Sequence, residues 1–429
     1  MIGTDTMNKA FYKTAAELSA CGLSGLPSEM RSSSHLIYSS PATLAFNSPG
    51  AKGYGVKRAG LAVPGSVMLL VAPACCGRNT SLFRTDPSYR DRFFFLLLDD
   101  TDIVTGRHLT KIPQAASEIF ESMDAPPSAL MICITCVDAL LGTDMERVCR
   151  KVTEKTGIPA VACYMYALTR EKTLHPMAHV RRSVYSLLEP QKRNSRDMNI
   201  LGFFTHLDDN SELYPLMRSI GIENIREIGR CSSFEEYKEM SKANFDLLIN
   251  PEGRHAALDM QKRLGIPFIE LFRLYRTDKI ANQYKLLADA LSVELDTDIY
   301  EKRARAAIER FRSKYPHTVF SVGEIQNGDP LEMALMLAEE GFEVSEVFCT
   351  IGEMNFPFLK QLAVLSPETR IYSNLSPSML FYEPDRSDIF IGCDSGYYHP
   401  DGKGIEWSSE DQPFGFYGVE KLFDELLSL

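Results

Sequence analysis

The amino-acid sequence predicts an α/β protein whose strands form mostly parallel sheets. Short apolar runs rich in β-branched residues alternate with amphipathic stretches of helical period almost from end to end. That alternation is typical of strand–helix–strand units. Several of the runs are followed at once by a stretch with a clear 3.6-residue period, which favours a helix directly after each strand.

The predicted strands are short and are separated by turn-forming residues. In chain order they cover residues 67–71, 93–98, 129–135, 159–163, 198–203, 224–228, 245–249, 267–270, 318–322, 343–349, 370–372 and 388–392. The clearest helices are predicted over residues 142–156, 212–220, 256–264, 299–314 and 330–340.

Two polar stretches, residues 189–196 and 312–316, divide the chain, because each ends just before a new predicted strand. We therefore expect three Rossmann-like domains with doubly wound, mostly parallel sheets around a central cleft. Their predicted bounds are 1–196, which includes an irregular N-terminal arm, 197–316, which ends in a charged bridging helix, and 317–429. The arm is expected to pack on a neighbouring molecule.

The composition excludes several classes of protein. The chain has 429 residues, of which 45% are hydrophobic, and a formal net charge of -11, whereas coating nucleic acid or an anionic membrane requires a basic surface. No apolar run approaches the ~20 residues that span a bilayer, and the first residues lack the basic and apolar segments of a signal peptide. We expect a cytoplasmic protein whose 10 cysteines are reduced thiols.

Two cysteine motifs carry the strongest chemical signal. Cys75 and Cys76, followed by Gly77, come just after one predicted strand, and Cys136 comes just after another. The carboxyl ends of parallel strands are where open α/β sheets bind ligands. Thiolates are soft ligands that suit iron–sulfur clusters, zinc or copper. The sequence therefore predicts that both motifs belong to one metal site.

Alternatives remain open for these thiols. The adjacent Cys75 and Cys76 diverge in an extended chain, so they would serve different irons of a cluster, or they are simply two small apolar residues in a turn. Zinc is an alternative metal if two chains each supply Cys75 and Cys136. Cys133 is predicted to be a core residue, since a separation of three along a strand places it on the opposite face from Cys136. Cys21 is an additional candidate ligand.

Other site candidates rest on position alone. Residues that follow predicted strands and could line the cleft are Arg254, His255, Asp394, His399 and Glu406. The chain has no Gly-x-x-x-x-Gly-Lys-[Ser/Thr] loop, so no nucleotide is expected to bind to this chain. A serine–histidine–aspartate set and a His-Glu-x-x-His pair are also absent from the sequence.

The two cysteine motifs resemble elements of the nitrogenase component 1 family. The segment Pro73-Ala-Cys75-Cys76-Gly77 resembles the family's Gly-Pro-x-Gly-Cys element, and residues 135–144 resemble its Thr-Cys element that ends in Gly-Asp-Asp. Three further segments, 264–268, 276–278 and 412–418, resemble family segments that support the fold. The resemblance implies that Cys75, Cys76 and Cys136 hold a bridging iron–sulfur cluster, either 4Fe-4S or larger, at a subunit interface.

The chain also departs from the family pattern. It has no cysteine between residues 22 and 74, where nitrogen-fixing members have another cluster ligand. The places of the two ligands of the iron–molybdenum cofactor fall near Ile249 and Asn250, and near Glu406. These residue types are not the family's cysteine and histidine, so the resemblance does not imply that the chain binds this cofactor or reduces dinitrogen.

The resemblance implies an oxidoreductase component that receives electrons from an ATP-dependent iron-protein partner and reduces an unidentified small molecule. The remaining cluster ligands would come from an identical or paralogous subunit, and the cluster would be oxygen-sensitive, as in an anaerobe. Two alternatives are a scaffold for cluster or cofactor assembly and a cluster-free protein that binds a small molecule.

Overall fold

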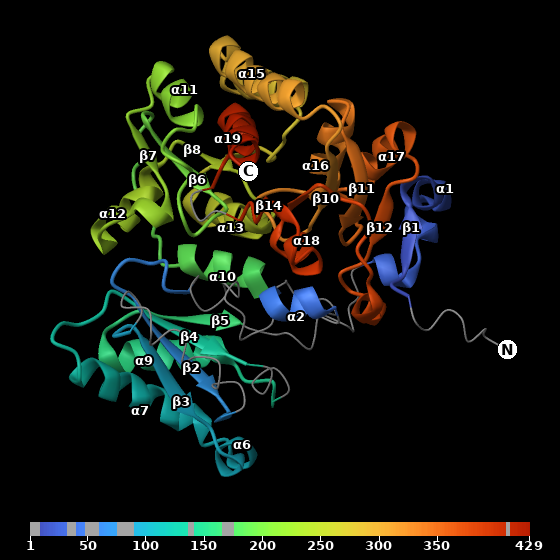
Figure 1. The fold of residues 1–429 in the computed structure, drawn as a ribbon. Helices are drawn as coiled ribbons and strands as arrows, with labels where there is room; N and C mark the ends of the chain where they lie inside the picture. Colours follow the sequence, from blue (N-terminus) through green and yellow to red (C-terminus); the bar gives the residue numbers. More distant parts are fainter. Residues whose placement is uncertain are drawn as a thin grey trace. The chain divides into compact units, whose positions relative to one another are not determined.

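The computed structural model is an α/β protein with three sheets whose strand pairs are parallel with one exception (Figure 1). It describes residues 9–31, 40–47, 60–74, 90–135, 141–164, 176–408 and 412–429. The predicted fold class is thereby confirmed. In the described part of the chain, no helix has both the length and the apolar character needed to cross a bilayer.

The chain forms two compact units, each made of separate stretches of sequence. One contains residues 49–206 and 222–272, and the other contains residues 1–48, 207–221 and 273–429. The division into three domains at about 196 and 316 remains a prediction. The first two sheets each lie within one predicted domain, whereas the third also takes β1 from residues 12–14.

The first sheet has the strand order β3-β2-β4-β5. Its strands are β2 (Val67–Ala72), β3 (Phe93–Leu97), β4 (Leu130–Ile134) and β5 (Ala160–Tyr164), and the helices beside them are α6 (Asp100–Thr105), α7 (His108–Glu121), α9 (Met145–Thr156) and α10 (Pro176–Tyr185). Every residue of β2 and β4 is buried. Alternate residues of β2 enter two different apolar clusters, Met68 and Leu70 on one face and Val67, Leu69 and Val71 on the other. This sheet is therefore covered on both faces, as its continuous apolar strands require.

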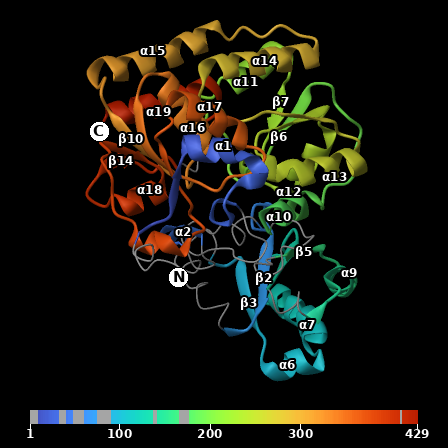
Figure 2. The same ribbon diagram turned by 90° about the vertical axis from the view of Figure 1, so that its right-hand side faces the viewer.

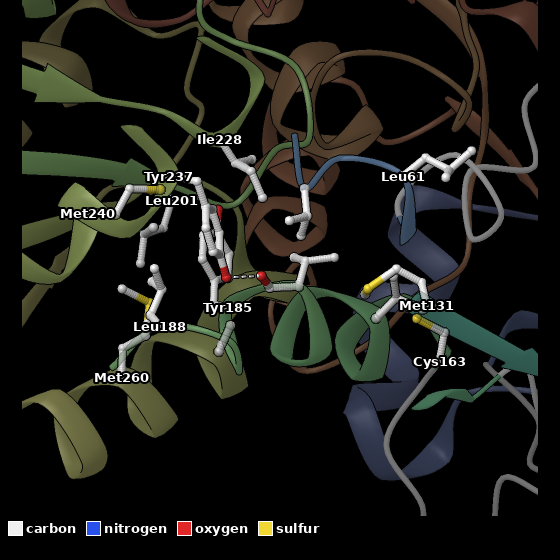
Figure 3. Packing of buried hydrophobic residues seen from close by; sticks show 14 of the residues in the cluster. Leu61, Met131, Cys163, Tyr185, Leu188, Leu201, Ile228, Tyr237, Met240 and Met260 are labelled. Carbon is white, nitrogen blue, oxygen red and sulfur yellow. Dashed lines mark hydrogen bonds between the residues drawn. The ribbon is translucent and has the colours of Figure 1, made fainter. Parts of the chain in front are cut away.

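The second sheet has the same winding, with the order β7-β6-β8-β9. It consists of β6 (Asp197–Leu201), β7 (Asn224–Arg226), β8 (Phe245–Leu248) and β9 (Phe268–Glu270), with helices α12 (Phe234–Lys238) and α13 (Arg254–Leu264) and three short 3-10 turns. One apolar cluster joins this sheet to the first through α10, where the Tyr237 hydroxyl donates a hydrogen bond to the Val184 carbonyl at 2.5 Å. Figure 3 shows Tyr185 and Leu188 of this connection among residues from both sheets.

The third sheet has the order β1-β12-β11-β10-β13-β14 and lies in the other unit (Figure 2). Its strands are β1 (Tyr12–Thr14), β10 (Val319–Val322), β11 (Glu343–Phe348), β12 (Arg370–Tyr372), β13 (Ile389–Ile391) and β14 (Lys403–Ile405). The helices of this unit are α1 (Ala15–Gly25), α2 (Pro41–Asn47), α11 (Leu213–Ser219), α14 (Thr277–Leu291), α15 (Asp298–Lys314), α16 (Pro330–Glu339), α17 (Phe356–Leu365), α18 (Cys393–Tyr398) and α19 (Gly415–Leu427).

Each predicted strand lies where the sequence places it, to within two residues at its ends, but β1 and β14 are absent from the sequence analysis. Both have only three residues, too few to show a period. In the N-terminal arm, β1 pairs antiparallel with β12 of its own chain. This segment is therefore an edge strand of the third sheet, and packing of the arm on a neighbouring molecule stays a prediction.

A buried carboxylate ties the segment 207–221 to the C-terminal helix. Glu212 accepts hydrogen bonds from the backbone N–H groups of Phe416 at 2.6 Å and Tyr417 at 3.1 Å, and from the Tyr284 hydroxyl at 2.8 Å. The N–H groups at the start of a helix lack partners within the helix and favour a negative charge. Gly415 makes the approach possible, since its φ is +65° and a Cβ there would lie 2.0 Å from the Glu212 Oε1 atom.

We expect Gly415→Ala to destabilise the protein by roughly 2–5 kcal/mol, because the substitution combines a left-handed backbone with a clash against Glu212. Urea unfolding would measure the loss. Gly352→Ala is the matched control, since no atom lies within 4 Å of its added Cβ and its φ is not positive. Equal stabilities of the two variants would contradict this account of Gly415.

Candidate functional site

The predicted cluster ligands Cys75, Cys76 and Cys136, with Gly77, lie outside the described residues. The strands that lead to them are described. β2 and β4 are parallel neighbours, and Val71 pairs with Ile134 near their carboxyl ends. The chain enters this sheet at β2, then places β3 on one side of it and β4 on the other. The carboxyl ends of β2 and β4 therefore flank the topological switch point, where sheets of this kind bind ligands.

The end of β4 carries a buried polar group that has no hydrogen-bond partner among the described residues. Thr135 is 2% exposed, and its Oγ1 atom forms no hydrogen bond within the described residues. A buried hydroxyl that lacks a partner costs about 1–3 kcal/mol. Its place directly before Cys136 makes it available as a donor to a bound group. Cys133, two residues earlier, is fully buried in an apolar cluster, as predicted for a core residue.

A set of polar contacts holds the chain that follows Cys136. Gly142 adopts φ +63°, and the Asp144 side chain caps α9 by accepting from the Arg147 N–H at 2.9 Å. Thr143 lies between them, with its hydroxyl 3.2 Å from Nε2 of the buried His108. The Gly142-Thr143-Asp144 segment is therefore fixed at the amino end of α9.

Asp102, which forms ion pairs with partly exposed cations, contacts His108 from the other side. The backbone carbonyl of Asp102 lies 3.3 Å from the His108 Nδ1 atom. The Asp102 carboxylate contacts the Lys111 ammonium at 2.5 Å and the Arg107 guanidinium at 3.0 Å. The hydrogen bond from Lys111 is the main reason that the pKa of Asp102 falls to about 2, which keeps the carboxylate charged.

The structure places the cleft candidates Arg254 and His255 at the exposed start of α13. Arg254 forms an ion pair with Glu270 at 2.5 Å. Just before them, Ile249 is buried, and the Asn250 side chain accepts from the Glu252 N–H at 3.0 Å. The side chains at positions 249 and 250 are therefore used in the core and in a turn.

Asp394, His399 and Glu406 belong to the other unit. Glu406 is exposed, whereas the Asp394 carboxylate is fully buried and accepts the backbone N–H groups of Glu324 and Ile325, each at 2.9 Å. Asp394 thus ties the end of β10 to the start of α18. Cys393 is 8% exposed, and burial is the main reason that its pKa rises to about 11. Cys21 is exposed on α1.

His399 belongs to a buried polar network inside the third sheet's unit. Its Nε2 atom lies 3.0 Å from Glu346, and its Nδ1 atom lies 3.0 Å from the Ser395 carbonyl. Glu346 also accepts hydrogen bonds from the hydroxyl groups of Ser321 and Tyr382, each at 2.8 Å. Burial alone would lower the pKa of His399, but the hydrogen bond and the charge of Glu346 outweigh it and raise that pKa.

Sequence reasoning missed Glu324, Glu346 and Asn374. They are isolated polar residues in or after short strands, and no motif marks them. Tertiary packing brings them together with Asp394 and His399, which were predicted only from their positions after strands. Among the residues that the structure describes, no three histidine, cysteine, aspartate or glutamate side chains are grouped so that they could hold a metal ion.

The fold and the strand order define an α/β protein with three mostly parallel sheets, a class in which ligands commonly bind at the carboxyl ends of the strands. The family model described as "Nitrogenase component 1 type Oxidoreductase" matches residues 52–407. The chain therefore belongs to this family, as the sequence analysis predicts.

Relatives in the family include proteins of two kinds. The nitrogenase iron-molybdenum cofactor biosynthesis protein NifE of Rhodobacter capsulatus is 28% identical over 47% of this chain and 44% of its own length. That of Rhizobium meliloti is 30% identical over 39% of this chain and 36% of its own. The nitrogenase molybdenum-iron protein alpha chain of Methanosarcina barkeri is 24% identical over 51% of this chain and 42% of its own length. The matched regions thus span less than half of these relatives.

A solved structure shares the fold. The structure titled "Nitrogenase Cp1 at pH 6.5" matches with a TM-score of 0.67 and 14% identity, over 92% of each chain. At this identity the likeness concerns the fold alone.

The His399 network predicts a pH-dependent stability. Because its folded pKa is raised, the contribution of protonated His399 is complete below the unfolded pKa of about 6.5 and is lost as the pH rises through the folded value. We expect His399→Gln to cost roughly 1–3 kcal/mol at pH 6 and less at pH 8.5, by urea unfolding. The exposed His317→Gln is the control. A cost that is the same at both pH values would refute the charged pairing of His399 with Glu346.

Proposed function

We propose that the chain is an assembly scaffold of the nitrogenase component 1 family, which holds an iron–sulfur cluster or cofactor precursor and passes it to an acceptor. The observation that carries the proposal is the pairing of β2 with β4. Val71 and Ile134 are partners in adjacent parallel strands, and the two cysteine motifs begin within four residues of them along the chain. Because so few residues separate the motifs from these strands, we propose that Cys75 and Cys136 lie near the carboxyl ends of β2 and β4.

The donor set suits an iron–sulfur cluster. Cys75 or Cys76, together with Cys136, would supply thiolate ligands, and the unpartnered Thr135 hydroxyl beside them would donate a hydrogen bond. A bound cluster would supply one-electron redox chemistry. One chain offers fewer than four such thiolates at this crevice, so the remaining ligands are proposed to come from an identical or paralogous subunit across a two-fold axis.

Three residues stand where the family resemblance would place the ligands of the iron–molybdenum cofactor, and their types favour a scaffold over a nitrogen-reducing enzyme. Ile249 is a core residue, Asn250 caps a turn, and Glu406 is an exposed carboxylate. None of the three is a thiol or an imidazole. A chain that lacks permanent ligands for a finished cofactor is suited to bind it weakly and release it. The NifE relatives, which are named for cofactor biosynthesis, agree with this role.

A second candidate is an electron-accepting component that reduces a small molecule with electrons from an ATP-dependent iron protein. The match to the alpha chain from Methanosarcina barkeri supports it. A third, a cluster-free protein that binds a small molecule, keeps the fold without the metal. Because the matched regions cover less than half of the relatives, the partners and the activity are proposals for this chain.

We expect Cys136→Ala to remove most of the iron and acid-labile sulfide from protein purified without oxygen, together with its visible absorption and its paramagnetic resonance signal. Cys133→Ala is the matched control, because Cys133 lies in the interior of β4 and packs in the core. It should lower stability without changing the iron content per folded molecule. Equal iron contents in both variants would refute the assignment of Cys136 as a ligand.

Cluster transfer separates the three candidate functions. The scaffold should lose its cluster to a purified apo-acceptor from the same organism, with iron moving from one protein to the other. The reductase should keep its cluster and consume electrons only when ATP and the iron protein are present. A colourless protein after anaerobic purification would support the cluster-free candidate and end the other two.

A further inference from the structure

We propose that the N-terminal arm is a strap over the carboxyl edge of the third sheet, and that the ionisation of a carboxylate pair, Glu324 and Asp394, controls how tightly it closes. The N-terminal arm here means the described residues 9–31 and 40–47. The inference concerns only the unit that contains the third sheet. It does not depend on the proposed cluster or on the role of the chain in assembly.

The carboxylate pair lies at the switch point of the third sheet. Apart from the edge strand β1, the chain starts this sheet at β10, then adds β11 and β12 on one side and β13 and β14 on the other. Glu324 follows β10 and Asp394 follows β13. The Asn374 side chain, 2% exposed, bridges them, with its Nδ2 atom 3.1 Å from Glu324 and 2.6 Å from Asp394. Two negative groups thus share one neutral amide.

The residues that hold the pair also anchor the N-terminal arm. The Thr350 N–H donates to Glu324 at 2.9 Å, and the next residue, Ile351, donates its N–H to the Met30 carbonyl at 2.9 Å. On the other side, the Asn374 carbonyl accepts from the Thr43 hydroxyl at 3.0 Å. Each of these anchors is therefore within one residue of a group that binds Glu324 or Asp394.

The arm makes further contacts along the same edge. The Ser373 hydroxyl donates to the Glu29 carbonyl, and Arg31 forms a parallel bridge with Ile351. Helix α2 packs on α18 and on the 3-10 turn Pro377–Phe381. These contacts cross the ends of β11 and β12 and reach the helix after β13. The arm thus covers the edge at which such sheets bind ligands.

No cation neutralises the pair within the described residues. Neither Glu324 nor Asp394 forms an ion pair there, and the arm's Arg31 guanidinium bonds the carbonyls of Ser24 and Leu26 instead. Among the described residues, the other titratable groups that act on the pair or on its neighbours are acids, thiols or phenols. They include Asp329 before α16, Cys349 after β11, Cys393, Tyr397 and Tyr398 on α18, and Glu406 after β14.

Burial, with the charge of Asp394 as a further cause, raises the pKa of Glu324 to about 7, and burial also raises the pKa of Asp394. Opening the strap would return water to the pair and lower both pKa values. Closure is therefore linked to proton binding. It is fully favoured below the open-state pKa of about 4.5 and is weakened as the pH rises through 7.

Hydrogen exchange of the full chain tests the inference. After correction for the intrinsic exchange rate, we expect protection of the amides in residues 26–31 and 40–47, and of Ile351, to fall roughly tenfold or more between pH 5.5 and pH 7.5. Glu324→Gln removes the titration of Glu324, the acid whose pKa is raised to about 7, but can still accept the Thr350 N–H. In this variant protection should change less than about twofold over the same range.

Two further variants keep the test decisive. Glu343→Gln changes an exposed carboxylate at the start of β11 and should retain the wild-type pH dependence. Thr43→Val removes a hydroxyl that anchors the arm but leaves the pair intact. Protection of residues 40–47 should therefore be lower at both pH values, with the same fold-change between them as in the wild type. The proposal would be overturned if protection in the wild type did not vary with pH. It would also be overturned if protection in Glu324→Gln fell with rising pH as much as it does in the wild type.

Discussion

The burial of β2 and β4 on both faces is the constraint on which the candidate site depends. All residues of these two strands are buried, and a shift of one residue in their pairing would move each apolar set to the other face. Their register is therefore strongly specified, and it places Val71 opposite Ile134. The two cysteine motifs leave the sheet at this point. The pairing of β2 with β4 is therefore sufficient to bring the starting points of the two motifs close together, as a shared metal site requires.

Buried carboxylates hold together segments that are far apart in the sequence. Glu212 bonds the start of the C-terminal helix, and Asp394 bonds the loop after β10. Glu346 joins the hydroxyl groups of Ser321 on β10 and of Tyr382 to His399. Each carboxylate is stabilised by several donors, as a buried charge requires. Such ties make the unit that contains the third sheet sensitive to pH at several points, because protonation of an acid or deprotonation of His399 changes the number of charges inside it.

Family membership describes the fold of this chain, whereas the residues at the candidate site bear on its function. Membership in the nitrogenase component 1 type oxidoreductases accounts for the three sheets and their winding. The side chains decide what the fold is used for, and fold alone does not. Here Ile249, Asn250 and Glu406 stand where the family resemblance would place cofactor ligands, while the cysteine motifs after β2 and β4 are kept. That combination is the basis for proposing temporary rather than permanent binding of a metal group.

The sequence by itself determined the fold class, the strands of five or six residues and the place of the cysteine motifs directly after two of them, because continuous apolar runs followed by helical periods are local signals. The strand order that makes this a switch point came from the tertiary structure. The sequence did not determine the pairing of β1 with β12, since three residues carry no period and the partner lies more than 350 residues away. Only the tertiary structure decided that Glu324, Asn374 and Asp394 form one group under the N-terminal arm. Each of these side chains is an ordinary polar residue in its own segment, and its environment arises only when distant strands end at the same edge of a sheet.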